Sequence, residues 1–246
     1  MVDCNNITHW FNSPYYHILY KHRDETEAES FINNLCERLS LSPGLKVLDV
    51  GCGRGRHARI LSRKGMYVTG IDISENNITE AKKLHDEKLY FEKWDMRNPY
   101  KEKYFDIVVN FFSSFGYFDS EDENLLALKS IVSNLKEYGT LILDYMNSEW
   151  TVKNIRQREI VTIENIQFHI TRKVQQGYVL KKISFISKSG VHEEFCEKLR
   201  IITLDTFKDY FKKANLAVTH LFGDYELNSF DSANSPRMIF VCKLMK

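Results

Sequence analysis

The stretch Lys46-Val47-Leu48-Asp49-Val50-Gly51-Cys52-Gly53-Arg54-Gly55 decides the fold of this 246-residue chain. Its first half is a short apolar run that predicts a buried strand, and residues 56–64 behind it predict a helix that ends at Gly65. Glycines in such a turn let the backbone bend sharply and approach a ligand where a Cβ atom would collide. The helix that follows directs its amino-terminal amides at the same ligand.

A carboxylate, Asp72, stands at the end of the next predicted strand, residues 66–71. At this distance from a glycine-rich turn, a carboxylate can accept hydrogen bonds from both hydroxyl groups of a ribose. The turn and Asp72 together therefore predict nucleoside binding. The Gly-x-Gly-x-x-Gly fingerprint of nicotinamide and flavin sites is not matched, because Gly55 comes one residue too early. Asp72 taken alone has a second interpretation, as a helix cap.

Strands and helices alternate from about residue 46 to residue 145, the pattern of a parallel sheet with right-handed crossovers. Further strands are predicted at residues 89–91, 105–110 and 140–145. Further helices are predicted at residues 74–87, capped by Ser74, and 121–136, capped by Ser120. A helix capped by Asp205 and two strands, 217–222 and 238–243, complete the pattern. We therefore expect an α/β fold around a parallel sheet.

Two other segments follow different patterns. From about residue 160 to residue 203 the apolar period is near two, which predicts three or four antiparallel strands inserted into the parallel fold. Residues 10–23 are dense in aromatic side chains and histidines, and His17 and His22 are among them. Residues 24–39 then follow a helical period that Pro43 and Gly44 interrupt.

Composition and charge describe an ordinary globular protein. The 34 basic and 33 acidic side chains nearly cancel, so the basic excess typical of nucleic-acid binding is missing and we expect no nucleic-acid partner. We expect no signal peptide, and no apolar run approaches the roughly 20 residues that span a bilayer. The five cysteines are scattered, with no Cys-x-x-Cys pair. A cytoplasmic protein with reduced cysteines and no membrane contact is the simplest prediction.

The pattern Asp-x-Gly-x-Gly-x-Gly at residues 49–55 resembles motif I of the class I S-adenosylmethionine-dependent methyltransferases. Three later segments agree with this resemblance: Lys93-Trp94-Asp95-Met96-Arg97, the strand 105–110, and the segment 135–144, which is similar to the family's Leu-Lys-x-Gly-Gly-x-Leu with Tyr138 in place of a glycine. The resemblance covers about residues 40–246. It implies a seven-stranded, mostly parallel Rossmann-like sheet flanked by helices.

The resemblance also implies the cofactor, S-adenosylmethionine (SAM), with S-adenosylhomocysteine (SAH) as product. The residues expected to bind it are Asp49, Gly51, Cys52, Gly53, Gly55, Asp72, Ile73, Asp95, Met96, Asn110 and Phe111. In this scheme the glycines approach the methionine and ribose, Asp72 holds the ribose, and Asp95 with Met96 frames the adenine. Asp95 alone has the interpretation of a turn residue. The histidines show no repeated ligand spacing, so we expect no metal.

The methyl acceptor is expected to be a small molecule. Family members that methylate base amines or glutamine amides usually carry (Asn/Asp)-Pro-Pro-(Tyr/Phe) after the fourth strand, whereas this chain keeps Asn110 and lacks both prolines. In small-molecule members an added sheet after the fifth strand covers the site, and an N-terminal helix closes it. Segments near the end of the insertion and of the chain also resemble a bacterial subgroup of stand-alone methyltransferases.

We therefore expect three parts: an N-terminal helical lid (residues 1–40), a SAM-binding Rossmann-like domain (41–150 and 204–246) and an antiparallel β insertion over the active site (151–203). The alternative for the aromatic segment is an apolar patch that packs on the core. Candidate residues for acceptor lining or proton removal are Tyr16, His17, Tyr20 and His192. The alternative functions are a SAM-binding scaffold without turnover, an RNA or protein methyltransferase, or an NAD-dependent oxidoreductase. The chain is expected to be a monomer or a homodimer.

Overall fold

The computed structural model describes Cys4, residues 7–21 and residues 25–245. His22 and Arg23, at the end of the aromatic segment of the sequence, lie outside the described residues. Within the described ranges, no helix is long and apolar enough to cross a membrane.

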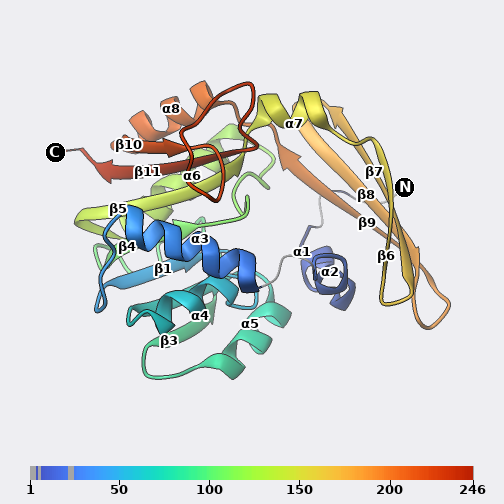
Figure 1. The fold of residues 1–246 in the computed structure, drawn as a ribbon, viewed down its shortest axis with the longest axis horizontal. Helices are drawn as coiled ribbons and strands as arrows, with labels where there is room; N and C mark the ends of the chain where they lie inside the picture. Colours follow the sequence, from blue (N-terminus) through green and yellow to red (C-terminus); the bar gives the residue numbers. More distant parts are fainter. Residues whose placement is uncertain (1–3, 5–6, 22–24, 246) are drawn as a thin grey trace.

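A seven-stranded sheet forms the centre of the molecule, with the strand order β10-β11-β5-β4-β1-β2-β3 (Figure 1). Its strands are β1 (Lys46–Val50), β2 (Tyr67–Asp72), β3 (Leu89–Lys93), β4 (Phe105–Asn110), β5 (Leu135–Met146), β10 (Leu216–Phe222) and β11 (Arg237–Leu244). The five strands β1 to β5 are parallel, whereas β11 runs antiparallel to both β5 and β10. The expected Rossmann-like sheet is confirmed, and the carboxyl ends of β1, β2, β4 and β5 meet at one edge.

Helices cover both faces of this sheet. The helices α6 (Glu121–Ser133) and α8 (Leu204–Lys213) bury Leu128 and Phe207 on one face. The helices α3 (Glu25–Arg38), α4 (Arg56–Arg63) and α5 (Glu75–Ala81) bury Phe31, Leu61 and Ile78 on the other. Apolar residues at helical spacing on each helix produce this arrangement, because each helix has one stripe to bury.

The predicted caps Ser74 and Ser120 are confirmed, and Ser120 forms a capping box with Glu123. The cap predicted at Asp205 is wrong. Thr203 has the extended backbone of an N-cap and accepts a hydrogen bond from the amide of Thr206, so Asp205 falls within the first turn of α8. The helix predicted to reach residue 87 ends earlier, as α5 followed by a single 3-10 turn, Lys82–Leu84 (η1).

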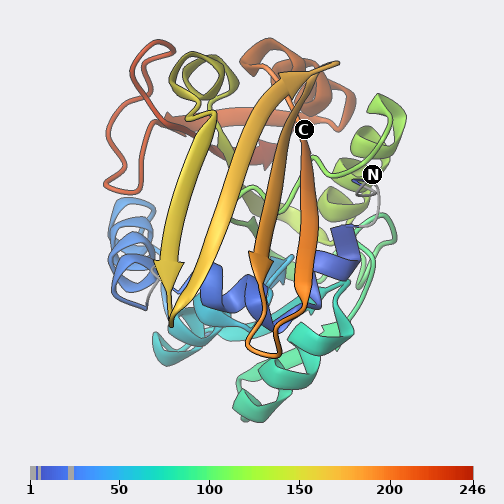
Figure 2. The ribbon, with the colours of Figure 1, turned by 90° about the vertical axis from the view of Figure 1, so that its right-hand side faces the viewer.

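The insertion is a separate four-stranded antiparallel sheet in the order β6-β7-β8-β9, which the helix α7 (Ser148–Asn154) connects to β5. Its strands are β6 (Arg158–Ile163), β7 (Ile166–Gln175), β8 (Tyr178–Ile186) and β9 (His192–Arg200). Figure 2 shows the four strands side by side in front of the N-terminal helices. The face toward those helices buries Phe168, Ile183 and Phe195, in agreement with the predicted period of two.

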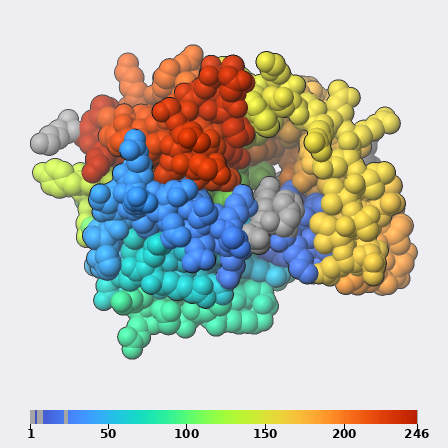
Figure 3. Space-filling view, in the orientation of Figure 1, coloured from blue at the N-terminus to red at the C-terminus, as the bar shows by residue number. Residues whose placement is uncertain are grey.

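Two short helices, α1 (Ile7–Phe11) and α2 (Pro14–Leu19), pack against this face, and Trp10 and Leu19 are buried there. In the space-filling view (Figure 3) blue N-terminal atoms lie between the insertion, in yellow and orange, and the central domain. The segment of residues 7–21 is called the lid below. The helix α3, which the expected boundary at residue 40 includes in the lid, instead packs in the core with α4.

A disulfide joins Cys4 to Cys196 of β9. This bond overturns the expectation that all five cysteines are reduced, because the fold brings together two residues that lie 192 positions apart in sequence. Cys36, Cys52 and Cys242 are free thiols, as expected.

Candidate functional site

The glycine-rich turn between β1 and α4 has three glycines in the left-handed region, with φ of 73° at Gly51, 56° at Gly53 and 82° at Gly55. A Cβ atom at Gly55 would lie 2.3 Å from Cζ of the buried Phe91, so that position requires glycine for packing. A Cβ atom at Gly53 would have no described atom within 4 Å. The turn therefore presents an open backbone surface at Gly53, where a ligand can approach.

Asp72 fixes the other side of this open surface. Its Oδ2 accepts a hydrogen bond from the amide of Gly53 at 2.9 Å, and its Oδ1 accepts one from the amide of Ser74 at 2.8 Å. Burial raises the pKa of Asp72, and these two amide donors oppose that rise. The N-cap of α5 is Ser74, so the interpretation of Asp72 as the helix cap is wrong. The carboxylate therefore lies beside the open backbone of Gly53, and its contact with a ribose stays a prediction.

Two buried polar side chains stand at the neighbouring strand ends. Asp49 is only 2% exposed, and its Oδ2 has no hydrogen-bond partner among the described residues. Burial and the nearby Asp72 raise the pKa of Asp49 to about 7. Asn110, at the end of β4, donates from Nδ2 to the carbonyl of Val50 at 2.8 Å, while its Oδ1 also lacks a described partner. Unpaired buried acceptors are costly, so both indicate a place where a donor is bound.

The turn after β4 is strained and firmly held. Phe112 and Ser113 both have left-handed φ values, 57° and 55°, which non-glycine residues rarely adopt. The fully buried Asp144 accepts the amide of Phe112 at 2.8 Å and pairs with Arg237, whose Nη2 lies 2.7 Å from Asp144 Oδ1. Nη2 of Arg237 also donates to Oγ of Ser113 at 3.0 Å. The ion pair thus fixes the segment that leads from Asn110 toward the lid.

Sequence reasoning did not assign Asp144 or Arg237 to the site. The only local signal is their charge next to apolar runs, because Asp144 follows the run 141–143 and Arg237 precedes the run 238–242.

Asp95 and Met96 follow β3, as predicted. Asp95 forms a two-point ion pair with Arg97, which donates from Nη2 to Oδ2 at 2.6 Å and from Nε at 3.1 Å. This neighbour holds the pKa of Asp95 below its usual range, so the carboxylate is charged at neutral pH. Met96 is half-buried against the core, and Ile73 beside Asp72 is 41% exposed. Ile73 therefore offers an apolar surface beside the carboxylate of Asp72.

Two of the predicted cofactor-binding residues have buried side chains. Cys52 is 7% exposed, and burial raises the pKa of its thiol, so it is not a nucleophile at neutral pH. Phe111 is 3% exposed and packs its ring against Phe31 and His57. At both positions the backbone is the part available to a ligand in the turn.

The lid contacts the cofactor side of the site directly. Asn12 accepts a hydrogen bond from Oγ of Ser74 at 2.6 Å, and Nε2 of His17 lies 2.9 Å from Oδ1 of Asn77. These partners begin α5, immediately after Asp72. Burial, reinforced by the charge of Arg54, lowers the pKa of His17 to about 4. His17 is therefore neutral at pH 7, and it donates to the amide oxygen.

The structure brings Tyr16 and Tyr20 close to His17, but not His192. Tyr16 packs its ring against those of Phe11 and Tyr20, at centroid distances of 5.4 and 4.8 Å. Phe11 in turn contacts Tyr117, which follows β4, edge to face at 5.4 Å. These rings form an aromatic wall between the lid and the end of β4.

His192 is exposed at the β8–β9 turn, where it pairs with Ile186. Glu197, the β9 residue that accepts hydrogen bonds from Trp10 and Tyr20 of the lid, is five residues further along, or about 17 Å at the usual rise of a strand. His192 therefore does not join the other candidates, because the strand carries it to the far end of the insertion.

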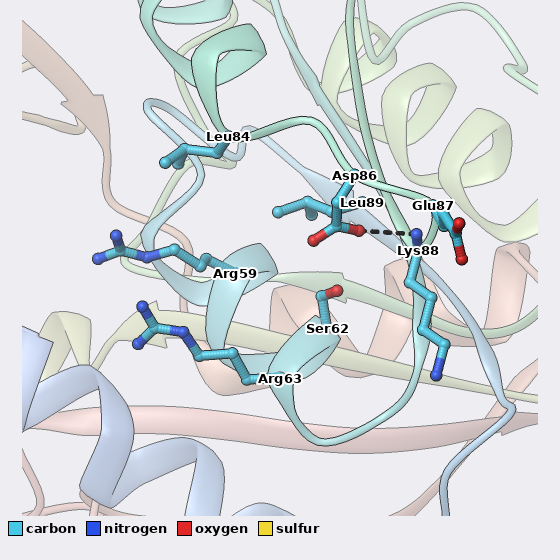
Figure 4. Close-up of a pocket in the computed structure, with 8 residues that line it drawn as sticks. All are labelled: Arg59, Ser62, Arg63, Leu84, Asp86, Glu87, Lys88 and Leu89. Atoms are coloured by element: carbon cyan, nitrogen blue, oxygen red, sulfur yellow. Dashed lines mark hydrogen bonds between the residues drawn. The ribbon is translucent and has the colours of Figure 1, made fainter.

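A hollow of about 540 Å³ lies elsewhere, between α4 and the segment before β3 (Figure 4). Figure 4 shows Arg59 and Arg63 extending from the same side of α4. The hollow is lined by Arg59, Ser62, Arg63, Leu84, Asp86, Glu87, Lys88 and Leu89. It lies toward the amino end of β3 and includes none of the predicted site residues.

Known proteins resemble the chain over most of its length. Residues 47–139 match the family described as a methyltransferase domain. The putative methyltransferase GWCH70_2453 of Geobacillus sp. (strain WCH70) is 27% identical over 229 residues, which cover 87% of this chain and 91% of that protein. The dTDP-3-amino-3,4,6-trideoxy-alpha-D-glucopyranose N,N-dimethyltransferase of Streptomyces venezuelae is 26% identical over 189 residues, which cover 72% and 77% of the two chains.

Among solved structures, an S-adenosylmethionine-dependent methyltransferase from Clostridium acetobutylicum ATCC 824 has a TM-score of 0.79 at 20% identity, with 94% of this chain and 96% of that chain covered. This likeness concerns the fold alone. The domain match adds the segment from β1 to the start of β5, which contains the glycine turn and Asp72. The chain therefore carries a methyltransferase domain in residues 47–139 and has the Rossmann-like fold of the class I S-adenosylmethionine-dependent methyltransferases.

Proposed function

We propose that this methyltransferase binds SAM at the glycine turn and transfers its methyl group to a small molecule held under the lid. The observation that carries the cofactor assignment is the pairing of Asp72 with the amide of Gly53, beside a backbone surface with no described atom within 4 Å of a Cβ position. When bound, SAM supplies a methyl group on a positively charged sulfur, which makes that carbon electrophilic.

The residues around the turn suit the separate parts of this cofactor. Asp72 has a carboxylate for the ribose hydroxyls, and the exposed Ile73 offers an apolar surface for the adenine. Asp95, already charged through its pair with Arg97, stands at the next strand end as an acceptor for the adenine amino group. The unpaired oxygens of Asp49 and Asn110 are acceptors for the donor groups of the methionine portion.

In this proposal the acceptor binds between the lid and the segment that follows β4. The lid connects the insertion to α5, and Phe11, Tyr16 and Tyr117 contribute the aromatic wall. Aromatic faces stabilise positive charge, which suits a reaction in which charge leaves the sulfur. Alignment of nucleophile and methyl carbon can contribute about 7–11 kcal/mol to such a displacement. The name of the Streptomyces venezuelae relative describes methylation of an amino sugar nucleotide, which supports a small acceptor.

His17 is a poor general base in this arrangement, because a pKa of about 4 leaves it with little affinity for a proton. Its role in the proposal is to hold the lid against Asn77. Tyr16 and Tyr20 line the acceptor side, and a base is needed only for a nucleophile that arrives protonated. The cytoplasmic location, the monomer or homodimer, and the absence of metal and nucleic acid stay predictions.

The experiment that tests the function is a methyl-transfer assay with SAM labelled on the methyl group. The purified protein is incubated with a panel of small amines, phenols, thiols and carboxylates, and labelled products are separated from SAM. We expect labelled product with at least one small acceptor and its loss in Asp72→Ala. The matched variant Asp86→Ala, in the hollow outside the site, keeps activity. Labelling of added RNA or protein, with no small product, contradicts the proposal.

A further inference from the structure

The strand β9 fastens the lid at two consecutive residues. Cys196 carries the disulfide to Cys4, which lies just before α1. Glu197, the next residue, accepts two hydrogen bonds on one oxygen, from Nε1 of Trp10 at 2.7 Å and from the hydroxyl of Tyr20 at 2.5 Å. One covalent bond and two hydrogen bonds thus hold the start of the chain and both short helices against the insertion.

The polar contacts at Glu197 lie in a largely enclosed place. The side chain of Glu197 is 14% exposed, and that of Lys181 on β8, which lies 3.8 Å from Oε2 of Glu197 and donates to Tyr20, is 11% exposed. Trp10 is 1% exposed. The two hydrogen bonds that Glu197 accepts form only while the lid is docked, because Trp10 and Tyr20 both belong to it. An undocked lid leaves the charge of Glu197 without its two donors, which favours the docked state.

On its other side, the lid forms hydrogen bonds with the start of α5, next to the expected cofactor site. Asn12 accepts from Ser74, whose amide donates to Asp72, and His17 contacts Asn77. The lid therefore links β9 to the strand end at which the ribose is expected. Any change that frees the lid from β9 also loosens the surroundings of Asp72.

We infer that the Cys4–Cys196 disulfide is a thiol-reactive modification site that controls docking of the lid over the cofactor. It is called the latch below. A thiolate of a small dithiol attacks Sγ of Cys4, the sulfur–sulfur bond breaks, and its electron pair goes to Sγ of Cys196, which takes a proton. The second thiol of the dithiol then displaces Cys4, so the protein disulfide is reduced to two thiols while the dithiol becomes a disulfide.

Exposure decides which sulfur reacts. Cys196 is 3% exposed, whereas Cys4 is half-buried, so attack occurs at Cys4. The free cysteines do not compete well, because Cys52 and Cys242 are buried and burial raises the pKa of both thiols and that of Cys36. In a reducing compartment, disulfides are typically reversible and regulatory. The latch depends on the proposed function only in assigning SAM to the site beneath the lid.

The test compares the oxidised and the dithiothreitol-reduced forms of the whole protein. Hydrogen exchange of the peptide that contains residues 7–21 reports lid docking, and the dissociation rate of SAH reports the consequence at the site. Reduction is expected to speed exchange of the lid and release of SAH by about tenfold or more, because the lid loses one of its two attachments to β9. Cys4→Ser should behave as the reduced form with or without dithiothreitol, and Cys36→Ser should behave as the unaltered protein.

Equal lid exchange in the two redox states overturns the latch, and so does a non-reducing digest in which Cys4 and Cys196 are not linked. The latch is also overturned if hydrogen exchange of the lid in Cys4→Ser still differs between the oxidised and the reduced protein, because another thiol then causes the redox dependence. Failure of the proposed function gives a different result: SAH does not bind in either state, while hydrogen exchange of the lid still decides whether the latch exists.

Discussion

Replacement of Asp72 by alanine should weaken cofactor binding and lower fold stability, and the two effects can be measured separately. The carboxylate accepts the amides of Gly53 and Ser74 at 2.9 and 2.8 Å, and the ribose hydroxyls are expected at the same group. A hydrogen bond to a charged group contributes about 1.5–3 kcal/mol, so the loss of one such bond weakens SAH binding about 10- to 140-fold. The two amides also lose their acceptor, which lowers the free energy of unfolding by about 1–3 kcal/mol. Because burial raises the pKa of Asp72, its charged form is already disfavoured, and the loss of stability lies toward the lower value.

The assay is calorimetric titration with SAH, with thermal unfolding of each variant as the check on folding. Asp86→Ala is the matched control, because Asp86 also accepts a backbone amide, that of Lys88 at 2.7 Å, but lies in the hollow outside the site. Asp86→Ala should keep the Kd of the unaltered protein. A folded Asp72→Ala protein with an unchanged Kd for SAH refutes the assignment of Asp72 to the cofactor site.

Four further variants test separate parts of the site. Gly53→Ala should weaken SAH binding and cost only about 1–3 kcal/mol of stability, because its Cβ fills open space. Gly55→Ala should lower the Tm more, because its Cβ would lie 2.3 Å from a buried ring. A larger fall in Tm for Gly53→Ala than for Gly55→Ala would contradict this assignment. Arg237→Met leaves the buried Asp144 without its counter-charge, so urea unfolding should show a loss of about 3–5 kcal/mol. A loss near zero would show that the pair is not needed. The pKa of His17 is lowered to about 4, so the undocked lid binds the proton more readily than the docked one between about pH 6.5 and pH 4. Lid docking, measured by hydrogen exchange, should therefore weaken as the pH falls through that window and stay constant above it, and His17→Gln should flatten the profile; an unchanged profile would exclude His17 as the titrating group.

The parallel sheet was predictable because its strands are buried on both faces. Such strands read as continuous apolar runs between helical segments, and β1 and β4 match their predicted residues. The boundaries of β5 were less accurate: the strand begins at Leu135, not at Thr140, because its first residues pair with Phe105 of β4 before the apolar run starts. In the insertion, the period of two held because only one face of that sheet packs on the protein.

The glycine turn and Asp72 were found from sequence because their chemistry depends on residues close to one another along the chain. The pair of Asp144 and Arg237 was not, since the two residues are 93 positions apart and no local spacing joins them. The disulfide and the contacts of Glu197 with the lid were missed for the same reason, because the partners lie far apart in sequence. His192 was misplaced among the candidates for a related reason: sequence shows that it belongs to a strand, but not toward which end of the site that strand runs.

The central claim is that the glycine turn and Asp72 bind an adenosyl cofactor. The most direct test is calorimetric titration of the folded protein with SAM and SAH, with NAD as the control ligand. The account predicts saturable, micromolar binding of both adenosyl compounds and no binding of NAD. Binding of NAD in preference to SAM, or the absence of any binding to a protein shown to be folded, would contradict it.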